Sequence, residues 1–245
     1  MARVAQIWRH PIKGIGAEPL DSVTLTAGRP LPGDRAWAMT TGDTVDTGTW
    51  QSCKNFARGC FGPQLMAITA RSAAGIVHLD HPTAGAIRID PARDGAALRD
   101  WLAPLWPEAR PALGSLIPAP EDTGLSDANY ACLSVLGTAS LAALSEACGR
   151  PLDPRRFRGN LWLSGLAPFE ELDWTGRRMQ IGATVLEVVE RIDRCRATQV
   201  NPETGEEDTP TLATLRKTWG HIDFGVKARV IAGGDIATGQ EITLL

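Results

Sequence analysis

Residues 184–205 read TVLEVVERIDRCRATQVNPETG, and this stretch decides how the rest of the chain is interpreted. Its first half alternates apolar and polar side chains, which is the period-two pattern of a half-buried strand. Its second half places Cys195 between Arg194 and Arg196, with Arg191 close before them. Nearby positive charge favours a thiolate, the form of cysteine that attacks electrophiles and binds soft metals. The alternative is a core cysteine in a strand, but the arginines make a poor apolar core.

Short strand patterns recur along the whole chain. Its 25 glycines and 17 prolines are spread along the chain and interrupt regular structure, so many short strands and helices are expected. Strands are predicted at Val4–Trp8, Ser22–Leu25, Trp37–Thr40, Leu65–Ala70, Ile76–Leu79, Ala86–Ile89, Asn160–Ser164, Arg178–Ile181, Thr184–Val189, Ala228–Ile231 and Glu241–Leu244. Helices are predicted at Asp94–Leu102, Thr138–Cys148 and Pro210–Thr218. The predicted fold class is therefore mainly β, of the barrel type, with a few short helices.

The length of 245 residues suits one to two domains at a typical ~150 residues each. The segment Pro104–Gly124 contains five prolines and shows no clear periodicity, so it is interpreted as the crossing between domains. The expected domains are residues 1–118 and 119–245. No internal repeat is present, which excludes solenoids and propellers.

Composition excludes several classes of protein. With 43% hydrophobic and 22% charged residues the chain is typical of a globular protein, and its net charge of −3 argues against binding to nucleic acid or an anionic membrane. The apolar stretch Tyr130–Leu144 is shorter than the ~20 residues of a membrane helix, and no signal peptide is visible. Five cysteines without a CxxC pair indicate a reduced, cytoplasmic protein.

Several other polar groups allow a purely structural interpretation. The pair His78 and His81 has ligand-like spacing but no third partner, so a turn is expected there. Glu170 and Glu171 are expected in a solvated loop or at a helix start. The cluster RRFRGN, residues 155–160, leads into a predicted strand and either presents arginines to an anion or forms a solvated basic turn.

Two early loops complete the set of candidates. The segment HPIKG, residues 10–14, ends the first predicted strand, and GDRAW, residues 33–37, opens another. A lone Lys13 or Arg35 in such loops is usually solvated. In order along the chain, the family-like segments are residues 10–14, 33–37, 156–161, 170–174, 181–182, 194–202, 224–226 and 239–242. With these segments the chain resembles MOSC-domain proteins that carry an N-terminal MOSC β-barrel domain, the arrangement of the mitochondrial amidoxime-reducing component and its bacterial relatives.

The resemblance implies a molybdenum cofactor, Mo-molybdopterin, bound in the MOSC barrel. Cys195 would be the metal ligand and the catalytic residue of the family. The residues that would bind the cofactor by phosphate, pterin and hydrogen-bond contacts are Lys13, Gly14, Arg35, Arg158, Asn160, Asp193 and Arg194. Converging Arg and Lys side chains suit a doubly charged phosphate.

Two of these residues depart from the family pattern, and two other places match it only loosely. Gly14 and Asp193 stand where relatives often carry Ser, and an acid beside an anionic cofactor must point away or pair with an arginine such as Arg191. Lys54 aligns loosely with a basic residue of relatives. Either Asn129 or Tyr130 substitutes for small polar residues that relatives place before the strand at 131–136.

The resemblance implies an oxidoreductase that reduces a small N-oxygenated, N-hydroxylated substrate with electrons from a separate ferredoxin- or cytochrome-type protein. The cofactor would supply the redox chemistry and the barrel would orient it. Two alternatives stay open: a non-catalytic carrier of the molybdenum cofactor, and a persulfide sulfur carrier that uses Cys195. A third alternative is a structural barrel whose cysteine is inert. A function related to pyridoxal phosphate binding is also left open.

Overall fold

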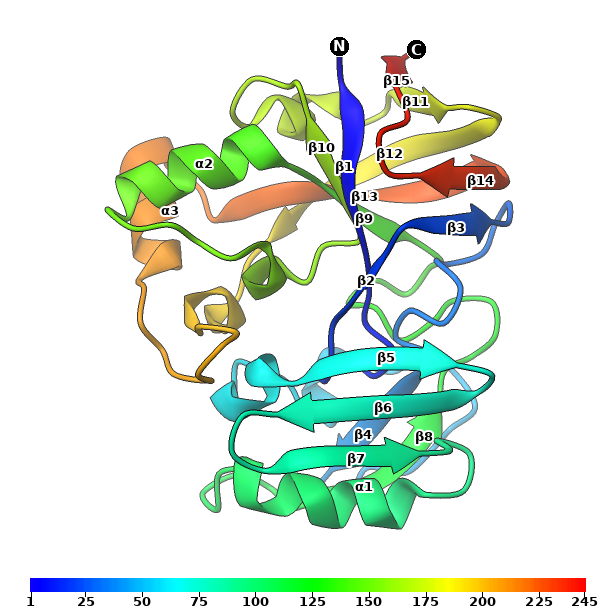
Figure 1. Ribbon diagram of the computed structural model, residues 1–245, viewed down its shortest axis with the longest axis vertical. Helices are drawn as coiled ribbons and strands as arrows, with labels where there is room; N and C mark the ends of the chain where they lie inside the picture. Colours follow the sequence, from blue (N-terminus) through cyan, green and yellow to red (C-terminus); the bar gives the residue numbers. More distant parts are fainter.

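The computed structural model describes all 245 residues and confirms a mainly β protein with a few short helices (Figure 1). Its largest element is an eight-stranded sheet in the order β15-β11-β12-β13-β9-β10-β1-β2. These strands are β1 (Arg3–Arg9), β2 (Glu18–Leu20), β9 (Leu133–Gly137), β10 (Leu161–Ser164), β11 (Arg178–Ile181), β12 (Thr184–Asp193), β13 (Asp223–Ala232) and β15 (Ile242–Leu244). Neighbouring strands are antiparallel except β9 and β10, which run parallel.

The large sheet curls until β1 meets the chain just before β15. Val4 donates to the carbonyl of Gln240 at 2.9 Å and accepts from the amide of Gly239 at 2.7 Å. A short two-stranded sheet of β3 (Ser22–Leu25) and β14 (Gly234–Ala237) lies beside it. The two termini therefore lie together at the top of Figure 1.

A second body lies below the large sheet in Figure 1. It consists of the pair β4 (Trp37–Thr41) and β8 (Leu113–Pro118), and of the antiparallel sheet β5 (Thr69–Ala73), β6 (Ile76–His81) and β7 (Gly85–Ile89). Helix α1 (Gly95–Leu102) covers its lower side. Leu98 and Leu102 are one turn apart on this helix and both are fully buried, so they hold it against the strands.

Each body has its own apolar core. The core of the large sheet has 27 buried residues and centres on aromatic rings, with Phe157 and Phe224 stacked 4.1 Å apart. Helices α2 (Thr138–Ala147) and α3 (Thr211–Trp219) lie side by side at its outer flank. The core of the second body has 14 buried residues and includes Ile12 and Ile15.

The chain passes between the two bodies several times. β1 belongs to the large sheet, Ile12 and Ile15 enter the lower core, and β2 and β3 return to the upper body before β4 descends again. Loops from the first 40 residues therefore lie where the bodies meet. The division at residue 118 stays a prediction, although the sheets group β1 to β3 with C-terminal strands.

One element prediction is wrong, and the strands β2, β8 and β14 are not among the predicted elements. The segment Leu65–Ala70 is mostly the 3₁₀ helix Pro63–Ala67, because Pro63 suits a helix start and a fully buried apolar run has no period that would identify a strand. The segment Pro104–Gly124, interpreted as the domain crossing, contains β8. Pro118 is the last residue of this strand and the other four prolines of the segment lie outside it, so the pairing of β8 with β4 is intact. None of the helices is long and apolar enough to span a membrane.

Candidate functional site

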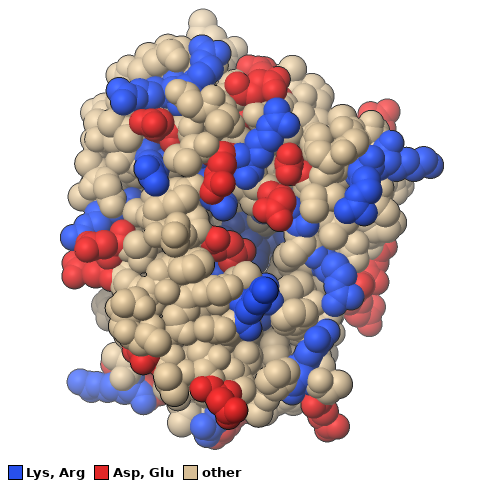
Figure 2. Space-filling view, turned by 180° about the vertical axis from the view of Figure 1, so that it is seen from behind, with Lys and Arg blue, Asp and Glu red and all other residues tan.

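A cavity of about 440 Å³ opens where the two bodies meet. The cationic side chains that line it are Lys13, Arg35, Arg58, Arg156, Arg158, Arg194 and Lys227. Only two carboxylates, Asp127 and Asp193, share the lining. Seen from behind, the surface has a hollow near its middle with Lys and Arg side chains visible inside it (Figure 2). A protein of net charge −3 thus concentrates positive charge at one internal site.

The structure brings nearly all the predicted site residues to this one place. Those that line the main cavity are Lys13, Gly14, Arg35, Arg158, Asp193, Arg194 and Cys195. Asn160 lines a smaller adjoining cavity of about 80 Å³, which shares Arg35, Arg158 and Arg194 with the main one. The roles assigned to these residues stay predictions, while their convergence is a property of the fold.

Arg35 is held by an ion pair within the N-terminal loops. Its guanidinium pairs with the buried carboxylate of Asp34, which also accepts a 2.7 Å hydrogen bond from the amide of His10. Although burial opposes it, the charge of Arg35 holds the pKa of Asp34 below its usual range. Burial lowers the pKa of His10 to about 3, so the imidazole is neutral at pH 7 and Asp34 balances Arg35. Arg35 also donates to the carbonyl of Arg158 at 2.8 Å, which joins the two bodies.

Lys13 is the second paired cation. Its ammonium donates to Asp127 at 2.5 Å and to the carbonyl of Leu125 at 2.8 Å, and burial lowers its pKa. The neighbouring Gly14 has φ +73°, and a Cβ there would lie 2.5 Å from the carbonyl oxygen of Ala57. Glycine is therefore required at this position by backbone conformation and close packing.

Arg158 and Arg194 are half-buried and have no carboxylate partner. Arg158 donates to the carbonyl of Ile12 at 3.3 Å, and Arg194 donates to the carbonyls of Phe157 at 2.8 Å and Phe224 at 2.7 Å. Burial and the nearby charge of Arg35 lower the pKa of Arg158 to about 9, and burial lowers that of Arg194 to about 10. Both remain charged at neutral pH.

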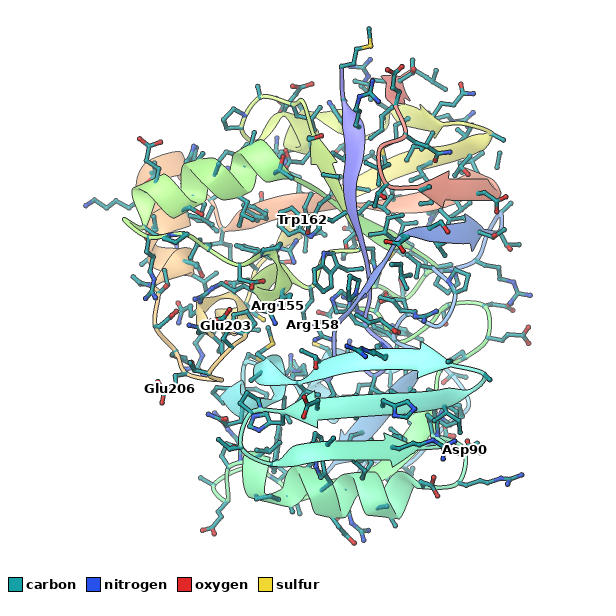
Figure 3. All side chains as sticks on the ribbon, in the orientation of Figure 1. Asp90, Arg155, Arg158, Trp162, Glu203 and Glu206 are labelled. Carbon is teal, nitrogen blue, oxygen red and sulfur yellow. The ribbon has the colours of Figure 1, made fainter.

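The backbone conformation of Arg158 is unusual for a residue other than glycine. This residue adopts the left-handed conformation at φ +47° and ends the 3₁₀ helix Pro154–Phe157. Non-glycine residues in this region store strain that persists only where surrounding structure enforces it. Figure 3 shows Arg158 at the level where the two bodies meet, with Arg155 beside it. Arg155 instead pairs with Asp153 at 2.6 Å and does not line the cavity.

Cys195 is exposed and lies just before the 3₁₀ helix Arg196–Gln199. A hydrogen bond from the thiol of Cys60 lowers the pKa of Cys195, and Arg194 contributes in the same direction. The same hydrogen bond raises the pKa of Cys60. The thiolate character predicted from the arginines thus has a second source, a thiol from the other body.

Two predicted binding residues have other surroundings than expected. Asn160 accepts hydrogen bonds from the amide and hydroxyl of Ser134 at 3.0 Å and donates to the carbonyl of Trp8 at 3.1 Å, so its amide joins β1, β9 and β10. Asp193 faces the cavity without an ion pair, because Arg191 pairs with Asp173 at 3.1 Å instead.

Sequence reasoning missed several of the lining residues, among them Arg58, Cys60, Asp127 and Lys227. Lys54 is exposed and outside the cavity, and Arg58 lies there in its place. The signal that was available is the segment Arg58-Gly59-Cys60, which repeats the nearby arginine and cysteine of the 191–196 stretch.

Other structural interpretations also changed. Glu170 and Glu171 begin the 3₁₀ helix Glu170–Trp174, which confirms the helix-start alternative, and Glu171 is fully buried and accepts from Gly137 and Ser140 rather than being solvated. His78 and His81 lie on strand β6 rather than in a turn. No group of histidine, cysteine or acidic side chains forms a preorganised metal site.

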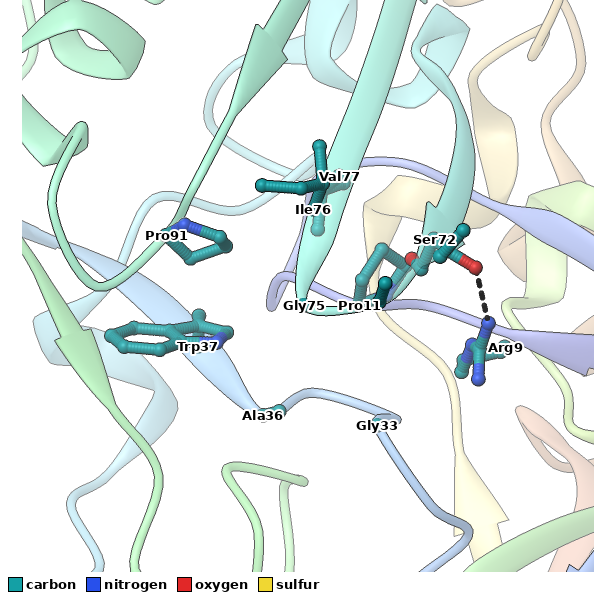
Figure 4. Close-up of a pocket in the computed structure, with 12 residues that line it drawn as sticks. Arg9, Pro11, Gly33, Ala36, Trp37, Ser72, Gly75, Ile76, Val77 and Pro91 are labelled. Carbon is teal, nitrogen blue, oxygen red and sulfur yellow. Dashed lines mark hydrogen bonds between the residues drawn. The ribbon is translucent and has the colours of Figure 1, made fainter.

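A second cavity of about 240 Å³ lies near β4 and the β5–β6 turn (Figure 4). Arg9 is the one charged side chain in its lining, and it donates to Glu18 at 2.6 Å and to the carbonyl of Ser72 at 3.4 Å. Since this arginine already has a carboxylate partner, the cationic cavity is the stronger candidate.

Comparison with known families covers both bodies. The family model described as the MOSC domain matches residues 122–243, and that of the MOSC N-terminal β barrel domain matches residues 1–103. In the solved structure of the YUAD protein from Bacillus subtilis the similar fold covers 99% of this chain and 94% of that one, with a TM-score of 0.50 and 15% identity.

The chain is similar to two kinds of protein, an amidoxime-reducing component and molybdenum cofactor sulfurases. The human mitochondrial amidoxime-reducing component 1 is 24% identical over 87% of this chain and 72% of its own length. The rice molybdenum cofactor sulfurase is 29% identical over 38% of this chain. This chain spans only about 13% of that sulfurase, and 8–14% of the other sulfurases it matches.

Proposed function

Because the chain belongs to the MOSC-domain family, we propose that its cationic cavity binds the molybdenum cofactor and that the loaded protein reduces N-hydroxylated compounds. Family membership and the names of its relatives support a function associated with this cofactor. The observation that carries the proposal is that two half-buried guanidiniums without a carboxylate partner line the same cavity as an exposed thiol of lowered pKa.

The donor set fits such a group. Arg158 and Arg194 are half-buried cations that donate only to backbone carbonyls, and a phosphate would supply the missing counter-charge through charge-assisted hydrogen bonds. Lys13 and Arg35 stand opposite, held in place by their own carboxylates. A cavity of about 440 Å³ offers room beyond a single phosphate.

Cys195 would ligate molybdenum, since a thiolate is a soft ligand and its pKa is already lowered. When bound, the cofactor supplies the change of oxidation state that the reduction needs. The chain would position the metal through Cys195 and would hold the phosphate with its arginines. Electrons would come from a separate ferredoxin- or cytochrome-type protein in a reducing cytoplasm.

A second candidate is sulfur transfer, favoured by the matches to molybdenum cofactor sulfurases. In this function Cys195 would carry a persulfide, or the cavity would carry the cofactor without reducing a substrate. A persulfide carrier would not require four converging cations, and this favours cofactor binding.

The test is elemental analysis for molybdenum, with pterin fluorescence after oxidation, on protein expressed in a host that makes the cofactor. We expect near-stoichiometric metal in the wild-type protein, loss in Cys195→Ser, and retention in Cys148→Ser, which lies at the end of α2 outside the cavity. Reduction of a benzamidoxime by the loaded protein with a reduced dye as electron donor then tests the reductase. Absence of metal together with a persulfide mass shift on Cys195 would favour sulfur transfer instead.

A further inference from the structure

Two cysteines from different bodies meet in the cationic cavity. Cys60 follows a turn of the lower body and Cys195 follows β12 of the upper one, and both line the cavity. Arg196 donates to the carbonyl of Cys60 at 3.1 Å. A Cβ built on Gly59 would lie 3.5 Å from the Cβ of Ala197, so the two segments are packed against each other. The two thiols are close enough that each shifts the pKa of the other.

The two thiols differ in access. Cys195 is exposed, whereas Cys60 is only 7% exposed. A small oxidant in the cavity would therefore reach Cys195 first and find Cys60 directly behind it. Arg58 and Arg194 line the same space and favour anionic sulfur.

From this juxtaposition we propose that Cys195 is a peroxide oxidation site and that Cys60 is its resolving thiol, so that the two form a reversible disulfide across the bodies. The sulfur of Cys195 attacks one peroxide oxygen, the O–O bond breaks, and the other oxygen leaves as water or an alcohol with the thiol proton. The sulfur of Cys60 then attacks the sulfenic acid, the S–S bond forms, and the S–O bond breaks with release of water. Two thiols are oxidised and one peroxide is reduced.

This inference goes beyond the proposed function and does not depend on a bound metal. While the disulfide is present, the sulfur of Cys195 is not a thiolate, so it can neither ligate a soft metal nor carry a persulfide. Reduction by a dithiol would restore both thiols. The resolving step would also protect Cys195 from irreversible overoxidation.

The remaining cysteines provide controls within the chain. Cys53 lines the same cavity and accepts a hydrogen bond from Arg58 at 3.0 Å, so it is the competing partner. Cys132 lines the smaller cavity and Cys148 lies at the end of α2. Trypsin separates the relevant thiols, because Lys54 and Arg58 lie between Cys53 and Cys60.

The first test uses the full chain, expressed without cofactor synthesis and treated with hydrogen peroxide. All five cysteines are free before treatment, and we expect the thiols counted in the denatured protein to fall from five to three. Non-reducing tryptic digestion should link the peptide 59–71 to the peptide 195–196, and dithiothreitol should release them. A link from peptide 36–54 instead, or a wild-type Cys195 that passes directly to sulfinic acid, would overturn the proposal.

Variants give the second test. Cys60→Ser should abolish the link and allow sulfinic acid to accumulate on Cys195, whereas Cys148→Ser should behave as the wild type. Cys53→Ser should also retain the link. If Cys53→Ser removes it while Cys60→Ser does not, the resolving thiol is misassigned. The peptide map of the unaltered chain decides the matter if Cys60→Ser does not fold.

Discussion

The two walls of the cavity present buried or half-buried cations in opposite electrostatic states. On the N-terminal wall Lys13 pairs with Asp127 and Arg35 pairs with Asp34. On the C-terminal wall Arg158 and Arg194 are satisfied by backbone carbonyls alone. The first pair is balanced within the protein, while the second is left for a ligand. Counting basic residues would not distinguish them, because the difference lies in their partners.

The largest effect should come from breaking a balanced pair. Arg35→Met leaves the carboxylate of Asp34 buried without its counter-charge, so the free energy of unfolding should fall by about 3–5 kcal/mol. Urea denaturation measures this. The control is Arg3→Met, which removes an exposed pair with Glu241 and should cost less than about 1 kcal/mol. Equal unfolding midpoints for the two variants would contradict the assigned role of Asp34.

Arg158→Met tests the other wall. Removal of an unbalanced half-buried cation should leave the stability of the ligand-free protein within about 1 kcal/mol of wild type or raise it. Affinity for inorganic pyrophosphate should fall by about tenfold or more, since about 1.4 kcal/mol of charge-assisted binding is lost. Calorimetric titration at fixed salt measures it. If Arg158→Met is as destabilising as Arg35→Met, the contrast between the two walls is wrong.

Two buried carboxylates also differ in whether a partner of opposite charge lies beside them. Glu171 belongs to the upper body, has no cation beside it, and burial raises its pKa, whereas the charge of Arg35 lowers that of Asp34. A raised pKa means that the folded state binds the proton more tightly than the unfolded chain does. Stability from Glu171 is therefore present at low pH and is lost as the pH rises from the unfolded pKa through the higher folded pKa.

Glu171→Gln should remove this dependence. Relative to wild type, the variant should gain stability as the pH rises above the usual carboxyl pKa. Asp34→Asn should show the opposite sign, because stability from Asp34 is present above the unfolded pKa and is lost as pH falls through the lower folded value. Thermal denaturation measures both, above the usual carboxyl pKa of about 4 for Glu171 and below it for Asp34. A Glu171→Gln curve parallel to wild type would mean that the carboxyl is charged in the fold.

The smallest effect concerns the two thiols. The hydrogen bond that lowers the pKa of Cys195 raises that of Cys60, so iodoacetamide at pH 7 should label Cys195 first. A tenfold rise in thiolate fraction is accompanied by about a threefold loss of intrinsic nucleophilicity, so the net gain in labelling rate is about threefold. Cys60→Ala, which removes the donor, should move the pH midpoint of labelling at Cys195 upward. An unchanged midpoint would show that Arg194 alone activates the thiol.

Local pattern predicted most of the strands and all three helices with small errors at their ends. The alternation of Thr184, Leu186 and Val188 is visible in the sequence, and these residues are buried on one face of β12. Errors arose where pattern is weak. The apolar residues 65–68 are all buried in a 3₁₀ turn, and β8 is defined by its pairing with β4 rather than by its own composition.

By itself the sequence determined the fold class, the resemblance to MOSC-domain proteins and the position of Cys195 among arginines. Local periodicity and neighbouring charge suffice for these, because each depends on residues close together in the chain. Only the tertiary structure decided which cations are balanced and which thiol faces Cys195. Lys13 and Asp127 are 114 positions apart, and Arg196 and Cys60 are 136 apart. Ion pairing and thiol contact depend on distances of a few ångströms, which folding alone sets between such distant residues.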